Sequence, residues 1–190
     1  MMPSVVVFVL AMSIILTSCI LTVKYNLYGF GRLVALAIFF ISLAFVTYTP
    51  DLEGYQNWML SDSGRDFFFR VVSNFAIGHG YGYEYVHIVF LSITTILIAI
   101  LLSRFLLSFS LVLMFFLLDH YIFLATQIRF FPAFFAMSLA LYYFTVKRRL
   151  IPFILFGLLA ISFHVSVLLL LIYLFFDKWL EKIDGFKLLG

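Results

Sequence analysis

Charged side chains are scarce in this sequence of 190 residues, because Asp, Glu, Lys and Arg together make up only 11% of it. A soluble domain carries about 25%. Hydrophobic residues reach 65%, and the mean hydropathy is +1.18, so the chain has too little polar surface to cover a soluble core. We therefore exclude a soluble enzyme and a nucleic-acid-binding protein, and we expect an integral membrane protein.

Cysteine and the sequence motifs of cofactor sites are also missing or rare. The single cysteine, Cys19, cannot form an intramolecular disulfide, which excludes a disulfide-stabilised scaffold. The sequence contains no metal-ligand spacing, phosphate-binding loop, dinucleotide fingerprint or nucleophile elbow. We therefore expect no cofactor and no metal, and the sequence argues against ATP-driven transport within this chain.

Long apolar runs between charged residues are the main pattern that is present. A bilayer core of about 30 Å is crossed by about 20 apolar residues of helix. Division of the sequence at its ionisable residues gives six runs of about this length, which predicts an all-α polytopic membrane protein with one transmembrane domain. The predicted spans are residues 4–23, 33–49, 85–103, 105–124, 130–146 and 150–176, with a long outer loop at residues 50–84.

The first run has a second interpretation. Residues 16–19 resemble a lipoprotein cleavage box, which would make the run a removable signal peptide. No Lys or Arg precedes the run, although signal peptides normally begin with basic residues. The sequence therefore favours an ordinary first span.

The positions of Lys and Arg predict the orientation of the spans. Alternate loops on one side hold basic residues and no acidic residue: Lys24, Arg32, Arg104, Lys147, Arg148 and Arg149. Because cytoplasmic loops are enriched in Lys and Arg, this side is predicted to be cytoplasmic. Both termini and the loop at residues 50–84 are then predicted to lie on the outer side.

Polar side chains concentrate in that long outer loop. Asp66, Arg70 and Asn74 recur every four residues and apolar residues fill the other faces, which predicts a helix lying in the membrane interface. The spacing also predicts an ion pair between Asp66 and Arg70. A solvated loop with an anchoring helix is the plainer interpretation of the same residues.

Arg129 stands where the fifth span is predicted to begin on the outer side. Pro132 follows in the first helical turn, where its missing N–H costs nothing. Arg129 and the N–H groups of this helix start would together suit an anion such as a phosphate. An arginine that snorkels to lipid headgroups, or one that pairs with Asp119, would explain the residue equally well.

His164 lies about the middle of the predicted sixth span. Ionisable residues at that depth are costly and usually face the interior of a bundle. Gly157, Ala160 and His164 share one helical face, which suits close helix packing around an imidazole. Both a structural hydrogen bond between helices and a catalytic role fit this position.

Four pieces of sequence, in order, resemble the EpsG-like family of bacterial exopolysaccharide and O-antigen polymerases (Wzy type). The likeness covers about residues 33–175. The pieces are Asp51 with Tyr55, then Gln127-Ile-Arg129, the basic turn Lys147-Arg-Arg, and Ser162-Phe-His164-Val-Ser166. In addition, Asp66 falls where a Glu often opens the interfacial segment of that family.

The resemblance implies an enzyme of the bacterial inner membrane with both termini in the periplasm. Such polymerases join oligosaccharide repeat units linked to undecaprenyl pyrophosphate at the periplasmic face, and they use no nucleotide sugar and no cofactor. The implied partners are this lipid-linked oligosaccharide, the bilayer, and other polysaccharide-assembly proteins such as a chain-length regulator or a flippase. Nucleic acid is not an expected partner.

The resemblance also implies roles for particular residues. Asp51 or Asp66 would be the general base toward the acceptor hydroxyl, and His164 would orient this carboxylate or act as the base itself. Arg129 would neutralise the departing pyrophosphate. The remaining substrate-binding residues would be Gln127, Tyr55, Arg70 and Glu84.

Two departures from the family pattern bear on these expectations. Many members carry an Arg shortly before Asp51, where this chain has Thr47, Tyr48 and Thr49, so Arg65 or Arg70 would supply that anion contact. Members also usually continue with further spans after the histidine, so we expect a truncated or short member.

The alternative functions are another membrane glycan-modifying transferase, a flippase, or a non-catalytic subunit that handles the same lipid-linked oligosaccharide.

Overall fold

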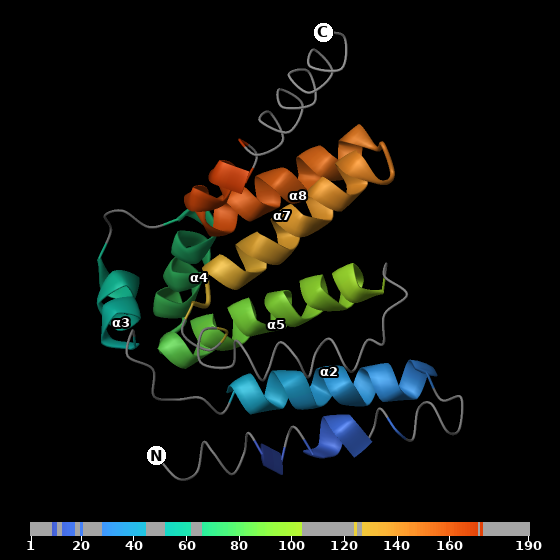
Figure 1. The fold of residues 1–190 in the computed structure, drawn as a ribbon. Helices are drawn as coiled ribbons and strands as arrows, with labels where there is room; N and C mark the ends of the chain where they lie inside the picture. Colours follow the sequence, from blue (N-terminus) through green and yellow to red (C-terminus); the bar gives the residue numbers. More distant parts are fainter. Residues whose placement is uncertain are drawn as a thin grey trace, which may run out of the picture.

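The computed structural model describes residues 9–10, 13–17, 20, 28–44, 52–61, 66–103, 124, 127–170 and 172. Within these residues the fold is all-helical and contains no strand, which confirms the predicted all-α class for this part of the chain. The helices are α2 (Tyr28–Ala44), α3 (Leu52–Leu60), α4 (Phe67–Gly78), α5 (Tyr83–Leu102), α7 (Phe130–Thr145), α8 (Leu150–Phe163) and the short 3-10 helix η1 (Val165–Val167) (Figure 1).

Four long helices lie side by side and form a bundle. α2 contacts α5, α5 contacts α7, and α7 contacts α8 (Figure 1). The end of α2, the starts of α5 and α7 and the end of α8 lie at one end of this bundle, which we call the site end. The other end holds the turn at residues 146–149 between α7 and α8, and we call it the basic end.

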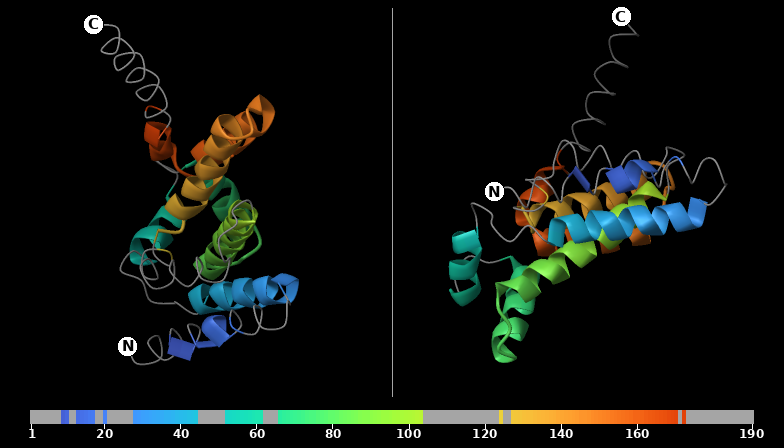
Figure 2. Two further views of the ribbon diagram at one scale, coloured as in Figure 1. Left: turned by 45° about the vertical axis from the view of Figure 1, so that its right-hand side comes forward. Right: turned by 90° about the horizontal axis from the view of Figure 1, so that it is seen from below.

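Two shorter helices cover the site end. α4 contacts both α5 and α8, and α3 contacts α4 and α5. Both lie beyond the ends of the long helices (Figure 2). They come from residues 50–84, the segment for which a long loop with one helix was predicted.

α7 is the most enclosed of the long helices. Small residues recur along it every three to four positions, at Ala133, Ala136 and Ala140, and all three are fully buried. Ala160 and Gly157 are buried on the facing helix α8. Because small side chains let helix backbones approach closely, α7 fits between α5 and α8.

The helix bounds agree with three of the predicted runs and correct a fourth. α5 and α7 lie within two residues of the predicted bounds 85–103 and 130–146. α2 covers residues 33–44 of the predicted run 33–49, but it begins five residues before that run, at Tyr28. The run at 150–176 is not one helix, because α8 ends at Phe163 and His164 has extended backbone angles. Of the run at 105–124 only Leu124 is described, and the run at 4–23 is described in part.

Length and hydropathy identify α5 as a helix that can cross a membrane. The apolar helices α2, α7 and α8 are shorter, at 14 to 17 residues. Both statements concern the described residues alone.

The packing of α7 gives a first prediction. Ala136→Leu should lower the free energy of unfolding by about 1–3 kcal/mol, because added methyl groups overpack a filled interior. The measurement is a denaturant titration of the purified protein. Ala37→Leu, the same exchange at an exposed position of α2, is the matched control. Equal stability of both variants would contradict the packing described for α7.

Candidate functional site

Three charged or titratable side chains meet at the site end. Arg129 Nη1 donates a hydrogen bond to Asp66 Oδ2 over 2.6 Å, and His164 Nδ1 lies 3.1 Å from the same oxygen. The backbone N–H of Val165 donates to Asp66 Oδ1 over 3.4 Å. The Asp66 carboxylate therefore links the start of α4 to the start of α7 and to the chain that leaves α8.

Asp66 is placed for this role by its position just before α4. Its backbone oxygen accepts the Arg70 N–H over 3.0 Å and so begins the helix. A residue at this position usually folds its side chain back onto the first helical N–H groups. The Asp66 side chain forms no such cap, and its carboxylate reaches across to Arg129 and His164 instead.

Arg129 is enclosed by aromatic rings. Its guanidinium carbon lies 4.0 Å from the ring centroid of Trp58, 5.6 Å from that of Tyr55 and 5.7 Å from that of Phe69. The side chain is only 11% exposed, and Nε is buried without a hydrogen-bond partner among the described residues. The contacts with these ring faces stabilise the cation where water is excluded.

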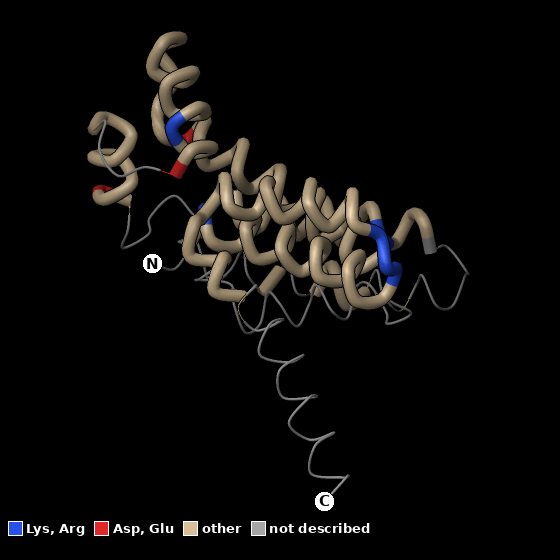
Figure 3. The backbone as a smooth tube through the Cα atoms, turned by 90° about the horizontal axis from the view of Figure 1, so that it is seen from above, with Lys and Arg blue, Asp and Glu red and all other residues tan. Residues whose placement is uncertain are grey.

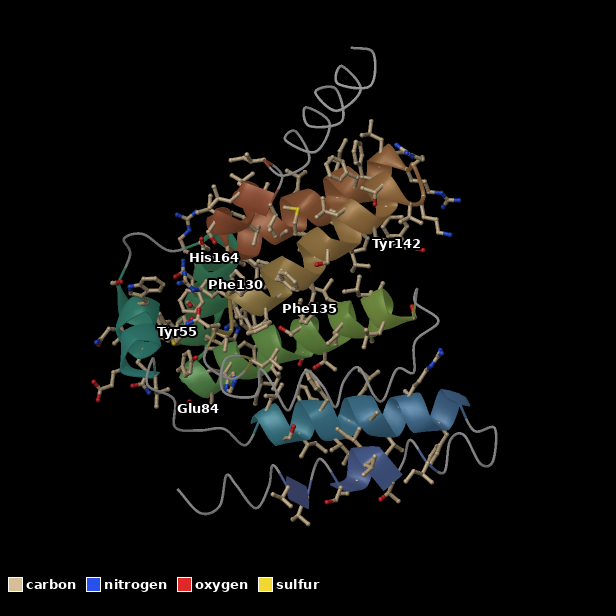
Figure 4. The ribbon with its side chains drawn as sticks, viewed as in Figure 1. Tyr55, Glu84, Phe130, Phe135, Tyr142 and His164 are labelled. Atoms are coloured by element: carbon tan, nitrogen blue, oxygen red, sulfur yellow. The ribbon has the colours of Figure 1, made fainter. Side chains whose placement is uncertain are left out.

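His164 is the most open member of the group, at 28% side-chain exposure against 10% for Asp66. It sits at the break between α8 and η1, with φ −161° and ψ 115°. Its imidazole meets the Phe130 ring edge to face, with centroids 6.2 Å apart (Figure 4). The expectation of a histidine inside a continuous membrane helix is therefore wrong, because the chain leaves the helix at this residue.

The start of α7 does not provide the anion site that the sequence suggested. The N–H groups of Phe130 and Phe131 both donate to the Gln127 carbonyl, over 3.1 and 3.3 Å. Pro132 has no N–H, and Ala133 donates to the Arg129 carbonyl over 3.4 Å. No N–H group of this first turn remains to bind an anion, so the part of that prediction that concerns the start of the helix is wrong for the structure as it stands.

The predicted ion pair between Asp66 and Arg70 is also wrong. Among the described residues, the ion pairs of Asp66 are with Arg129 and His164. The Arg70 guanidinium lies 5.9 Å from the ring centroid of Phe67. Four-residue spacing allowed the pair, but Asp66 precedes the helix and its side chain is directed toward α7 and α8.

The other predicted site residues take different positions. Tyr55 is 6% exposed and stacks on Tyr83, with centroids 5.9 Å apart, so it forms part of the wall around Arg129. Gln127 closes the turn before α7 through its carbonyl. Glu84, in the first turn of α5, lies on the far side of Tyr55 from His164 (Figure 4). Asp51, and Asp119 as a partner for Arg129, lie outside the described residues.

Sequence reasoning predicted Tyr55 but missed the other aromatic residues next to Arg129 and His164. Trp58 is 39% exposed and lies closest to the guanidinium. Its spacing of three from Tyr55 was a usable signal, because residues three apart share one face of a helix. Phe69 and Phe130 gave no such signal, since aromatic residues are common throughout this chain.

The arrangement defines a carboxylate, an imidazole and a guanidinium in mutual contact. A carboxylate beside Nδ1 favours the tautomer that carries its proton there, which leaves Nε2 to accept a proton from a substrate. The geometry thus suits general-base chemistry at His164, with Asp66 as the orienting group. Among the described residues, no cluster of His, Cys, Asp and Glu is suited to a metal ion.

Comparisons with family models, with curated proteins and with solved structures return no match for this chain.

The link between Asp66 and Arg129 gives a second prediction. In a double-mutant cycle of Asp66→Asn and Arg129→Gln, the coupling free energy of unfolding should be about 1–3 kcal/mol, because both groups are largely removed from water. Unfolding of the four purified proteins measures it. The control cycle pairs Glu53→Gln with Arg70→Gln and should show additive effects. Additivity in the first cycle would contradict the ion pair.

Proposed function

We propose that this chain is a polymerase of bacterial surface polysaccharide that joins lipid-linked repeat units at the outer face of the inner membrane. One observation carries the proposal. The sequence predicts a part in this chemistry for each of Asp66, Arg129 and His164, and Arg129 and His164 follow Asp66 in the chain by 63 and 98 residues. Their convergence on one carboxylate supports a common role.

The placement of apolar and charged side chains supports a polytopic membrane protein. Large apolar side chains on the outer surface of α8 are exposed, with Ile151 at 74% and Leu155 and Leu158 at 62%. The turn of the basic end carries Lys and Arg without an acidic residue beside them, while the described acidic residues lie toward the site end together with other basic residues (Figure 3). The uncharged length between them is the part that would lie in the bilayer.

The same arrangement supports the proposed orientation. The turn with Lys147, Arg148 and Arg149 lies at the basic end, which the positive-inside rule assigns to the cytoplasm. Asp66, Arg129 and His164 lie at the opposite end and would therefore open to the periplasm. A lipid-linked oligosaccharide presented on the outer leaflet would meet them there.

The proposed reaction is a glycosyl transfer. The oxygen of an acceptor hydroxyl attacks the anomeric carbon of the donor sugar, and the bond from that carbon to the pyrophosphate oxygen breaks. The hydroxyl proton passes to Nε2 of His164, whose orientation is set by Asp66. Arg129 stabilises the negative charge on the departing lipid pyrophosphate. Tyr55 and Trp58 hold the Arg129 side chain in position.

A complementation experiment tests this function and gives a third prediction. The chain, expressed in a polymerase-deleted host of matching glycan type, should restore a polysaccharide ladder on a gel. His164→Ala should reduce polymer by about 100-fold or more, the usual contribution of a general base. His79→Ala, which removes an exposed histidine of the same outer segment, should leave the ladder unchanged.

Equal membrane expression of all variants is checked by immunoblot. Absence of a ladder from the wild-type chain, or a full ladder from His164→Ala, would contradict the proposed function. Transfer of unpolymerised repeat units to the outer leaflet without a ladder, in a host that also lacks its own flippase, would favour a flippase instead.

A further inference from the structure

The Arg129 guanidinium, the group at the site best suited to a phosphate, already binds the Asp66 carboxylate. A guanidinium binds phosphate and carboxylate oxygens with the same planar set of donors. In this structure, Arg129 Nη1 is held by Asp66 at 2.6 Å, and the ring of Trp58 covers the guanidinium at 4.0 Å. An incoming anion therefore finds a cation whose charge is balanced by a carboxylate of the chain itself.

Among the described residues, the backbone N–H groups at the start of α7 offer the anion no other place. The first turn of α7 has used its N–H groups on the carbonyls of Gln127 and Arg129. Burial without a partner at Arg129 Nε shows that the guanidinium still has donor capacity that Asp66 does not use. An anion that reaches Arg129 must compete with Asp66 for these donors.

Asp66 can leave Arg129 without losing all its partners. If the contact with Arg129 breaks, the Asp66 carboxylate still has two donors within reach. They are His164 Nδ1 at 3.1 Å and the backbone N–H of Val165 at 3.4 Å. A buried carboxylate that kept no donor would be costly. The two remaining contacts therefore allow a second arrangement, in which Asp66 binds His164 and Val165 while Arg129 is released.

We propose that a diphosphate binds by exchange, taking Arg129 from Asp66 and leaving the Asp66 carboxylate to His164 and Val165. This inference rests on the proposed function, and it adds that the diphosphate displaces Asp66 from Arg129 before His164 accepts the proton. The carboxylate acts as an internal anion that holds Arg129 until the ligand arrives.

The exchange would link substrate binding to proton transfer. While Arg129 holds Asp66, the carboxylate charge is shared between the guanidinium and the imidazole. After exchange, the full charge faces His164 and favours the imidazolium that forms when Nε2 accepts the hydroxyl proton. The base would thus become effective only when the leaving group is in place, which protects the repeat unit from unproductive reaction.

Binding of inorganic pyrophosphate to the full chain in nanodiscs tests the exchange and gives a fourth prediction. Asp66→Asn should bind pyrophosphate about tenfold more tightly than wild type, within the usual range of coupling between two ligands of one group. Arg129→Gln should lose the binding. Glu53→Gln removes the same charge from the neighbouring helix α3 and should leave the affinity unchanged.

A second probe separates free from lipid-linked ligand. Farnesyl diphosphate in the nanodisc bilayer should show the same ratio between Asp66→Asn and wild type if the site serves a lipid diphosphate, and no binding if it serves a soluble one. Should Asp66→Asn not yield a monodisperse protein, Asp66→Ser also removes the charge and keeps an oxygen, with the same expected direction.

Equal or weaker pyrophosphate binding by the Asp66 variants would overturn the exchange. That result together with a restored polysaccharide ladder would leave the proposed function standing. Tighter binding without any ladder would support the exchange and contradict the polymerase, so the two failures are distinguishable.

Discussion

The contact between the Asp66 carboxylate and Arg129 is the interaction on which the site end depends. It joins the start of α4 to the start of α7 over 2.6 Å, and through His164 it also holds the end of α8. Such a pair is costly to form away from water, and removal of one partner is more costly still. Three aromatic rings around Arg129 and two further donors on Asp66 offset that cost.

The same contact explains the shape of the chain around it. α8 stops at Phe163 although no proline or glycine follows, and the N–H of Val165 turns to Asp66. α4 begins at Phe67 without a side-chain cap, because the carboxylate is engaged elsewhere. Two local irregularities thus have one cause, and both place titratable groups at the end of the bundle that the charge distribution assigns to the outer face.

Sequence reasoning reached the all-helical class, placed two apolar runs within two residues of the bounds of α5 and α7, and singled out Asp66, Arg129 and His164, which the structure brings into contact. It succeeded there because long apolar runs and isolated ionisable residues are strong signals in this composition. It failed where tertiary contacts override local pattern. Helical spacing paired Asp66 with Arg70, and an unbroken apolar run hid the end of α8. The ring of Trp58 over Arg129 depends on how α3 meets the bundle, which no local pattern records.

The central claim is that Asp66 and His164 meet across 98 residues of sequence. The most direct measurement is chemical crosslinking of Asp66→Cys with His164→Cys in native membranes, with Cys19→Ser to remove the other thiol, read by mass spectrometry. A short bis-methanethiosulfonate crosslinker, which reacts with two thiols and releases sulfinate, should join this pair and should not join Asp66→Cys to Arg149→Cys at the basic end. Failure to crosslink residues 66 and 164, with both cysteines shown to be reactive, would contradict the account.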